Sequence, residues 1–157
     1  MFGNVYQWKK VLITGNTGFK GAWLTSWLLK LGAEVIGVSK DIPTTPSMFE
    51  LLELKHQIHH YKNDIRDLHK MIEIVSNEKP DFLFHLAAQP IVSKSYNEPI
   101  ETISSNVLGT ANILEALKIS NHNCIAVLIT SDKAYENLEQ VWGYKETDQL
   151  GGKDIYS

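Results

Sequence analysis

The sequence predicts an α/β fold, a doubly wound parallel sheet whose strands lie in the order 3-2-1-4-5. Short apolar runs alternate with amphipathic stretches from residue 10 to residue 130, and strands joined through helices pair in parallel by right-handed crossovers. The first apolar run breaks directly into three glycines spaced by threes, which is typical of the first strand-to-helix turn in such a sheet. The 157 residues suffice for one domain of this kind.

Apolar periodicity places each element in turn. Runs of β-branched and other apolar residues predict strands over residues 10–14, 34–39, 58–63, 82–86 and 124–130. Apolar residues that recur every three or four positions predict helices over residues 19–31, from about 47, over 67–77 and over 100–120. Two prolines predict a loop over residues 41–46. No regular periodicity follows residue 130.

Composition and charge argue against several classes of function. The net charge is −3 and Arg66 is the only arginine, so the basic face of a nucleic-acid-binding protein is not expected. No apolar run approaches the roughly 20 residues that cross a bilayer, and residues 1–10 lack the apolar stretch of a signal peptide. We therefore expect a cytoplasmic protein that has no membrane contact.

The cysteine and histidines do not indicate a metal centre. Cys124, the single cysteine, opens an apolar strand and is interpreted as a small buried hydrophobic residue. His56, His59 and His60 are near neighbours, but no cysteine or carboxylate completes a familiar ligand set around them. We interpret these histidines as part of a partly exposed strand edge and expect no metal site.

The three glycines of the first turn point to a phosphate group. Gly15, Gly18 and Gly21 follow the first strand and open the first helix. Without β-carbons, the backbone N–H groups of such a turn can approach a pyrophosphate, and the helix N-terminus adds partial positive charge. An ordinary glycine-rich turn is the alternative, but the strand before and the helix after favour dinucleotide binding.

The end of the second strand offers an acid and two cations. Asp41 lies 20 positions after Gly21, the offset expected of a carboxylate that binds an adenosine ribose hydroxyl. A solvated loop aspartate is an equal alternative. The acid favours NAD over NADP, with NADP as the alternative because Lys20 or Lys40 is able to meet a 2′-phosphate instead.

The third and fourth strand ends suit the rest of a coenzyme. Asp64 and Ile65 provide one polar and one apolar contact for an adenine. Ala87 and Ala88 allow a flat ligand to approach the backbone closely, although tight packing alone also explains them. Ligands of open α/β sheets bind beyond the carboxyl ends of the strands, where all these residues are expected.

The fifth strand end carries the reactive groups. Thr130, Ser131, Asp132 and Lys133 place hydroxyls, an acid and an ammonium at one mouth of the sheet, where a solvated turn is the alternative. Tyr156 follows Ser131 by 25 residues. A phenol has an ordinary pKa of about 10 and needs a nearby cation to act as a base near neutrality, so Tyr156 alone is more often a packing residue.

Five segments together resemble the extended short-chain dehydrogenase/reductase family. Within that family the resemblance is to the nucleotide-sugar 4,6-dehydratases that act on CDP-glucose, and it covers essentially the whole chain. Where dTDP-sugar dehydratases typically carry Thr-Asp-Glu, this chain has Ser131, Asp132 and Lys133, which is the most discriminating feature. The segments are Thr-Gly-Asn-Thr-Gly-Phe-Lys-Gly (14–21), His-Leu-Ala-Ala-Gln-Pro (85–90), Ser-Asp-Lys-Ala-Tyr-Glu-Asn (131–137), Trp-Gly-Tyr-Lys-Glu (142–146) and Leu-Gly-Gly-Lys-Asp (150–154).

The resemblance implies a Rossmann fold that binds NAD and a definite reaction. NAD would take hydride from sugar carbon 4 while Tyr156, assisted by Ser131, removes the hydroxyl proton. Asp132 and Lys133 would then remove the proton at carbon 5 and release the carbon 6 hydroxyl as water, in roles left open between them. The coenzyme-binding residues that the resemblance implies are Gly15, Thr17, Gly18, Phe19, Lys20, Gly21, Asp64, Ile65, Leu86, Ala87, Ala88, Gln89 and Asn106. The strand ends add Asp41 and Thr130. Asn106 has an alternative role as a brace for a loop.

The resemblance also bears on domain organisation. The lysine that the family carries four positions after its tyrosine would fall beyond Ser157, as would a substrate domain. We therefore expect residues 1–157 to be the NAD-binding domain of a longer dehydratase for deoxysugar and surface polysaccharide synthesis, truncated before the substrate domain and with little turnover of its own. Another nucleotide-sugar dehydratase, a 4-epimerase or a coenzyme-binding module without turnover are the alternatives. A homodimer is expected of the full-length protein, with the apolar stripe on residues 100–117 as its surface or, equally, as core.

Overall fold

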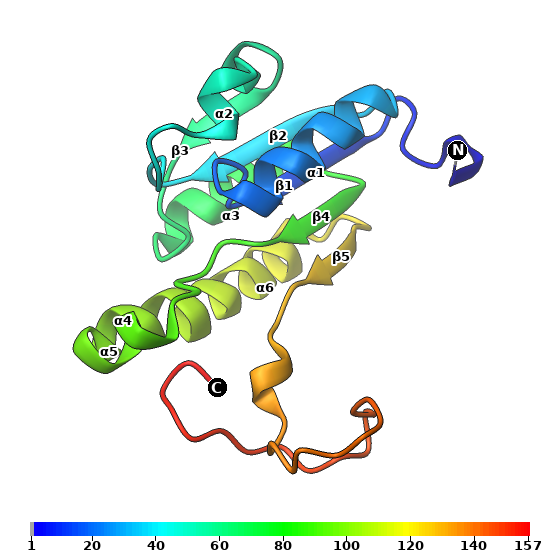
Figure 1. The fold of residues 1–157 in the computed structure, drawn as a ribbon. Coiled ribbons are helices and arrows are strands. Elements are labelled where there is room, and N and C mark those ends of the chain that lie inside the picture. The colour runs from blue at the N-terminus through cyan, green and yellow to red at the C-terminus, as the bar shows by residue number, and fades with distance from the viewer. Residues whose placement is uncertain (1) are drawn as a thin grey trace.

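A computed structural model describes residues 2–157 and confirms the predicted fold class. Five parallel strands form one sheet in the order β3-β2-β1-β4-β5. Helices α1 and α2 cover one face of the sheet, and α3 and α6 pack together on the other (Figure 1). The strands are β1 (Lys10–Thr14), β2 (Glu34–Ser39), β3 (His59–Lys62), β4 (Phe82–His85) and β5 (Ile125–Leu128). The longer helices are α1 (Phe19–Lys30), α3 (Leu68–Glu78) and α6 (Gly109–Ser120).

Two buried layers position the strand ends. On one face, Leu12, Ile36 and Leu83 from three neighbouring strands pack against α3 and α6. On the other, Val11 and Ile13 pack against α1 and its flanking segments. The central strands are therefore buried on both faces, as parallel strands between two helical layers must be.

Short elements begin where side chains cap them. The Ser47 hydroxyl accepts a hydrogen bond from the Glu50 backbone N–H and starts α2 (Met48–Leu51), and the Asp67 carboxylate accepts from Lys70 N–H and starts α3. Both starts agree with the sequence expectation. A short 3₁₀ turn, η2 (Leu54–His56), then leads into β3.

The long helix predicted over residues 100–120 is wrong in detail. The structure divides it into α5 (Pro99–Ile103), a π-helical turn η3 (Ser104–Leu108) and α6, and adds α4 (Val92–Asn97) before it. A π-turn inserts an extra residue into the hydrogen-bond ladder, which changes the phase of the helix faces and often marks a functional site. Periodicity counted through η3 therefore misassigns the faces on either side of it.

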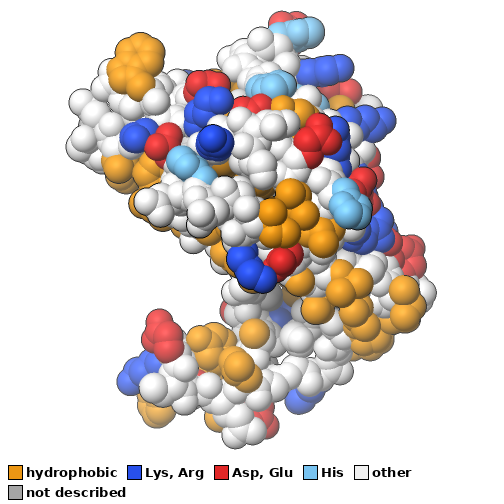
Figure 2. Space-filling model, turned by 180° about the vertical axis from the view of Figure 1, so that it is seen from behind, with side chains coloured by type: hydrophobic (Ala, Val, Ile, Leu, Met, Phe, Trp, Pro, Cys, Tyr) orange, Lys and Arg blue, Asp and Glu red, His pale blue; other side chains and the backbone are white. Residues whose placement is uncertain are grey.

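The apolar stripe on residues 100–117 lies largely outside the core. Ile100, Val107 and Leu114 are exposed, whereas Ile113 and Ala116 carry the buried face of α6. Figure 2 shows hydrophobic side chains gathered on this side of the molecule. The two expectations for the stripe are a dimer surface or core. Because most of it is exposed, it is not core within this chain.

The edges of the sheet explain the histidines and the cysteine. His59 and His60 lie on β3, which is an edge strand, as predicted, whereas the prediction is wrong for His56, which lies on the preceding turn η2. Cys124, directly before the other edge strand, is half-buried against the α3–α6 layer, and burial raises the pKa of its thiol to about 11. Among residues 2–157 no helix has the length and apolarity to span a bilayer, and no group of three metal-binding side chains occurs.

Residues 131–157 form an extended segment that leads away from β5 (Figure 1). It contains a short 3₁₀ turn, η4 (Asp132–Ala134), and one antiparallel bridge between Tyr135 and Leu150. The stacked rings of Tyr135 and Tyr144, with centroids 5.3 Å apart, pack this segment on itself. Its irregular backbone agrees with the loss of periodicity after residue 130.

The buried layers make a direct prediction for stability. Leu12 lies on β1 and is fully buried against α3. Replacing it by alanine leaves a cavity and should lower the free energy of unfolding by about 2–5 kcal/mol. Leu51→Ala, at a side chain that is 73% exposed, is the matched control and should change it by less than about 0.5 kcal/mol. Urea unfolding followed by circular dichroism measures both, and equal effects would contradict the assignment of the core.

Candidate functional site: the carboxyl ends of the strands

The glycine turn between β1 and α1 lies in close contact with the end of β4. Gly15 has φ +74°, and a β-carbon at this position would lie 2.8 Å from the Ala87 nitrogen. A β-carbon on Gly21 would overlap the Gly15 carbonyl oxygen. Both positions therefore require glycine, one for its backbone conformation and one for the approach of α1 to the turn.

The first amides of α1 are available to a ligand. Gly18 is the N-cap residue and makes no side-chain cap, and among residues 2–157 the N–H groups of Phe19, Lys20 and Gly21 have no acceptor. Only the Gly15 oxygen, at 3.4 Å, lies near the space that a β-carbon of Gly18 would fill. Unpaired N–H groups at a helix N-terminus, next to a surface without side chains, fit a pyrophosphate.

Buried polar side chains hold the turn from below. Asn16 is fully buried; its Oδ1 accepts a 2.7 Å hydrogen bond from the Ser39 hydroxyl, and its Nδ2 lies 3.3 Å from His60 Nδ1. The Thr17 hydroxyl donates to the Asp41 carbonyl oxygen at 2.7 Å. Side chains thus tie the turn to the end of β2 and to β3. The surface of the turn that carries the N–H groups of residues 19–21 stays open.

A second polar chain joins β1, β4 and α6. The Thr14 oxygen accepts from the N–H groups of Leu86 and Ala87, both at 3.2 Å, so its hydroxyl donates to His85 Nδ1 at 2.7 Å. The His85 proton then lies on Nε2, which donates to the Thr110 hydroxyl at 3.0 Å. Burial lowers the pKa of His85 to about 4, so the ring is neutral near pH 7.

Asn106 in the structure braces the loop after β4. Its Oδ1 accepts from the Gln89 N–H at 2.7 Å and its Nδ2 donates to the Gln89 carbonyl at 3.1 Å. The Gln89 side chain is also used internally: its amide nitrogen donates to the Thr102 hydroxyl and its oxygen accepts from the Ile91 N–H. The brace that we considered as an alternative role for Asn106 is therefore present.

The end of β3 carries an ion pair and an apolar contact. Arg66 donates to both carboxylate oxygens of Asp64 at 2.6–3.1 Å, which holds the pKa of Asp64 below its usual range. Ile65 is buried and packs so closely on α6 that a β-carbon on Gly109 would overlap it. The two residues predicted to contact an adenine are thus held by partners within the chain, Asp64 by Arg66 and Ile65 by α6.

The end of β5 places Ser131, Asp132 and Lys133 on one short turn. The Ser131 hydroxyl accepts from the Lys133 N–H at 3.2 Å and donates to Asp132 Oδ1 at 3.4 Å. Asp132 and Lys133 line a hollow of about 480 Å³ within residues 132–157. Within residues 2–157, no hydrogen bond joins the Tyr156 side chain to these three residues, so the structure does not bring the four reactive groups into one hydrogen-bonded cluster.

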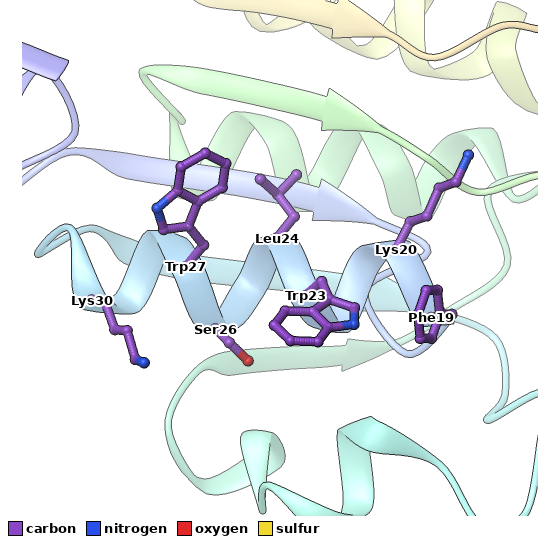
Figure 3. Close-up of a pocket in the computed structure, with 7 residues that line it drawn as sticks. All are labelled: Phe19, Lys20, Trp23, Leu24, Ser26, Trp27 and Lys30. Carbon is purple, nitrogen blue, oxygen red and sulfur yellow. The ribbon is translucent and has the colours of Figure 1, made fainter. Parts of the chain in front are cut away.

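A further hollow, of about 570 Å³, lies on the outer face of α1. Figure 3 shows Phe19 and Lys20 at the N-terminal end of α1, which lies at the carboxyl ends of the strands. Trp27 and Lys30 lie towards the C-terminal end of the helix. Phe19 and Trp23 are more than half exposed, and Gly21, Ala22, Thr25 and Leu28 form the buried face. Lys20 therefore lies beside the glycine turn, whereas the tryptophans face away from the sheet.

These features together define a doubly wound α/β domain with an open glycine turn at the carboxyl ends of its strands, and comparison with known proteins gives its family. The family model described as GDP-mannose 4,6 dehydratase matches residues 12–157. The match covers nearly the whole chain, so the chain belongs to this family of nucleotide-sugar dehydratases and epimerases.

Individual relatives show which enzymes of the family the chain is similar to. The chain is 48% identical over 154 residues to CDP-glucose 4,6-dehydratase from Salmonella typhimurium, which covers 98% of the chain and 43% of that enzyme. It is 34% identical to CDP-paratose 2-epimerase from Salmonella typhi over 88% of the chain and 41% of that protein. The crystal structure of UDP-glucose 4-epimerase from Thermus thermophilus in complex with NAD superposes with a TM-score of 0.80 at 25% identity, over 94% of this chain and 46% of that one. The chain thus spans less than half the length of the relatives it matches.

Sequence reasoning missed the residues that support the site. The four residues are Thr14, Asn16, Ser39 and His85, and all are buried. Thr14 hydrogen-bonds to His85 and Ser39 to Asn16, but none of them is predicted from the sequence to be a site residue. A signal was available: polar residues at the ends of otherwise apolar strands must find buried partners. Their role is to fix the glycine turn, so no contact of theirs with a ligand is implied.

Burial of neutral His85 predicts an acid-sensitive fold. Its pKa is about 4 in the folded chain and about 6.5 when unfolded, so between these values the unfolded state binds more protons. Stability should therefore fall as the pH drops from 6.5 towards 4, with about 3 kcal/mol from this residue. Urea unfolding at several pH values should show a shallower dependence in His85→Gln. His122→Asn, at an exposed ring, should keep the original slope; equal slopes in all three proteins would refute the assignment.

Proposed function

We propose that residues 1–157 form the NAD-binding domain of a nucleotide-sugar 4,6-dehydratase that acts on CDP-glucose. The observation that carries this proposal is the glycine turn, pressed against Ala87 and open above three unpaired helix amides. The 48% identity to a CDP-glucose 4,6-dehydratase over 98% of the chain supports the substrate. The UDP-glucose 4-epimerase of similar fold that was crystallised with NAD supports the coenzyme.

In this proposal each strand end contacts a different part of the coenzyme. Gly15, Thr17, Gly18, Phe19, Lys20 and Gly21 surround the pyrophosphate, Asp41 faces the adenosine ribose, and Asp64 with Ile65 faces the adenine. The segment 86–89, braced by Asn106, together with Thr130, lies on the nicotinamide side. When bound, NAD supplies an acceptor that takes a hydride from the sugar and returns it.

The chain's own reactive residues would move the protons. Tyr156, assisted by Ser131, accepts the proton of the carbon 4 hydroxyl as that carbon is oxidised. Asp132 and Lys133 remove the proton of carbon 5 and protonate the departing hydroxyl of carbon 6, which leaves as water. The 4-keto-6-deoxy sugar would be complete once carbon 6 has received the hydride back and one of the two residues has returned a proton to carbon 5, which balances the reaction.

The wider setting is part of the same proposal. We place the enzyme in the cytoplasm as a homodimer, with the exposed apolar residues of α5 to α6 at the dimer surface, and in the synthesis of deoxysugars for surface polysaccharide such as O-antigen. Another nucleotide-sugar dehydratase or a 4-epimerase is the alternative in the same family. The 34% identity to a CDP-paratose 2-epimerase favours a CDP-linked sugar within that range.

A coenzyme-binding module without turnover is a second candidate for these 157 residues. The observation in its favour is that Tyr156 makes no side-chain hydrogen bond to Ser131 or Lys133. The chain also matches only 43% of the Salmonella typhimurium enzyme. Binding of NAD without product from CDP-glucose would favour this candidate, and product would exclude it.

Coenzyme binding is tested by titrating the 157-residue chain with NAD in a calorimeter. Gly15→Ala should weaken binding at least about tenfold, because the new methyl group meets the Ala87 backbone and φ +74° is strained for alanine. Gly143→Ala, where a β-carbon meets nothing within 4 Å, is the matched control and should bind as the native chain does. Thermal melts of both variants separate loss of binding from loss of fold. Native affinity in Gly15→Ala would contradict the site.

The chemistry is tested in a chimera in which this chain replaces the matching segment of the Salmonella typhimurium enzyme. The chimera should form a 4-keto product from CDP-glucose, detected by absorbance after alkali treatment. Lys133→Met should lower kcat about 100-fold or more, the range for loss of an acid–base group. Lys70→Met removes the same charge from a pair with Glu73 on α3 and should leave kcat unchanged. Product from GDP-mannose but none from CDP-glucose would contradict the proposed substrate.

A further inference from the structure

Four charged side chains meet where the ends of β2 and β3 face α5. Glu101 of α5 pairs with Lys40 through one carboxylate oxygen, at 3.1 Å, and with the Arg66 guanidinium through the other. Arg66 in turn forms its two-pronged pair with Asp64. Glu101 is thus the one residue of the described chain that joins both cations of this group.

The position of this group relates it to the proposed coenzyme site. Lys40 follows the last residue of β2, and its neighbour Asp41 is tied to the glycine turn through Thr17. Arg66 lies two residues after Asp64, beyond the end of β3. In an open α/β sheet with a glycine turn after β1, the ribose of the adenosine lies at the end of β2. Lys40 therefore stands at the place where NADP carries its additional 2′-phosphate, and Glu101 links Arg66 to this place.

Glu101 is built to stay ionised at this place. The Lys40 ammonium, and next the Arg66 guanidinium, lower the pKa of the Glu101 carboxyl below its ordinary value. The Ser105 hydroxyl donates a further hydrogen bond at 3.4 Å. The side chain is 29% exposed, so the pairs are partly shielded from water. With two carboxylates and two cations, the group has no net charge to offer an added phosphate.

We propose that Glu101 is a specificity-determining residue that favours NAD over NADP by occupying Lys40 and Arg66. The inference rests on the proposed coenzyme site. Without Glu101, the Lys40 ammonium and Nη1 of Arg66 would lose their carboxylate partner, while Nε and Nη2 of Arg66 stay paired with Asp64. Charge-assisted contacts from such groups are the usual means of binding a phosphate. With Glu101 present, binding of the 2′-phosphate must break both pairs and bring a second anion beside the carboxylate.

The experiment compares NAD and NADP in calorimetric titrations of the 157-residue chain. Glu101→Gln keeps the size of the side chain and removes its charge, so it should raise the affinity for NADP about tenfold and change that for NAD less than about threefold. Glu98→Gln removes the same charge three residues earlier, from a pair with Lys94 on the surface, and should leave both affinities unchanged. Adding Lys40→Ala to Glu101→Gln should abolish the gain for NADP.

Each other outcome speaks against the proposal. An equal gain for both coenzymes in Glu101→Gln, or the same NADP gain in Glu98→Gln, would show a general charge effect and overturn it. Thermal melts test folding, and Glu101→Ser provides a second route to the same comparison; if neither variant folds, Glu101 is structural and the proposal fails. If the native chain binds neither coenzyme, the proposed function fails first, and the inference fails with it.

Discussion

The close approach of the glycine turn to the end of β4 governs the geometry of this domain. Gly15 lies against the backbone of Ala87 with no room for a β-carbon between them. In the sheet order 3-2-1-4-5, the chain crosses from one half of the sheet to the other after β3, so the switch point of the topology lies between β1 and β4. Crevices for ligands form at such a switch point because the connecting segments leave in opposite directions. The contact therefore fixes the width of the crevice where the proposed coenzyme lies.

Such a contact brings backbone and polar side chains into a dry interior, where each must find a partner. The Thr14 hydroxyl serves two backbone N–H groups and His85, and the Asn16 amide serves Ser39 and His60. These polar groups are all paired on the buried side of the turn. The unpaired N–H groups of residues 19–21 therefore lie on its open side. The same arrangement that stabilises the turn thus directs its donors towards the place of a phosphate.

The fold could be predicted from the sequence because its signals are local and agree with one another. The bounds of β1 and β2 follow from apolar runs, and the capping residues Ser47 and Asp67 mark helix starts. The π-turn at residues 104–108 could not be predicted, because it depends on tertiary contacts. Asn106 within it bonds to Gln89, which lies 17 residues earlier in the chain. Likewise the partners of Glu101 lie just beyond the ends of β2 and β3, at separations of 61 and 35 residues that no local pattern reveals.

The two ends of the proposed site are held by different kinds of contact. The adenosine end consists of strand ends and buried polar side chains, which are held by hydrogen bonds between segments far apart in the sequence: Thr17 to Asp41, Ser39 to Asn16 and Arg66 to Glu101. The reactive end consists of Ser131 to Lys133 and Tyr156, whose hydrogen bonds join only residues a few positions apart in the same segment. Interactions of short range in sequence orient a turn but do not fix it relative to the sheet. A bound coenzyme would touch both ends, so the well-held adenosine end determines where it lies, and the reactive residues must be ordered against it by contacts beyond those within their own segment.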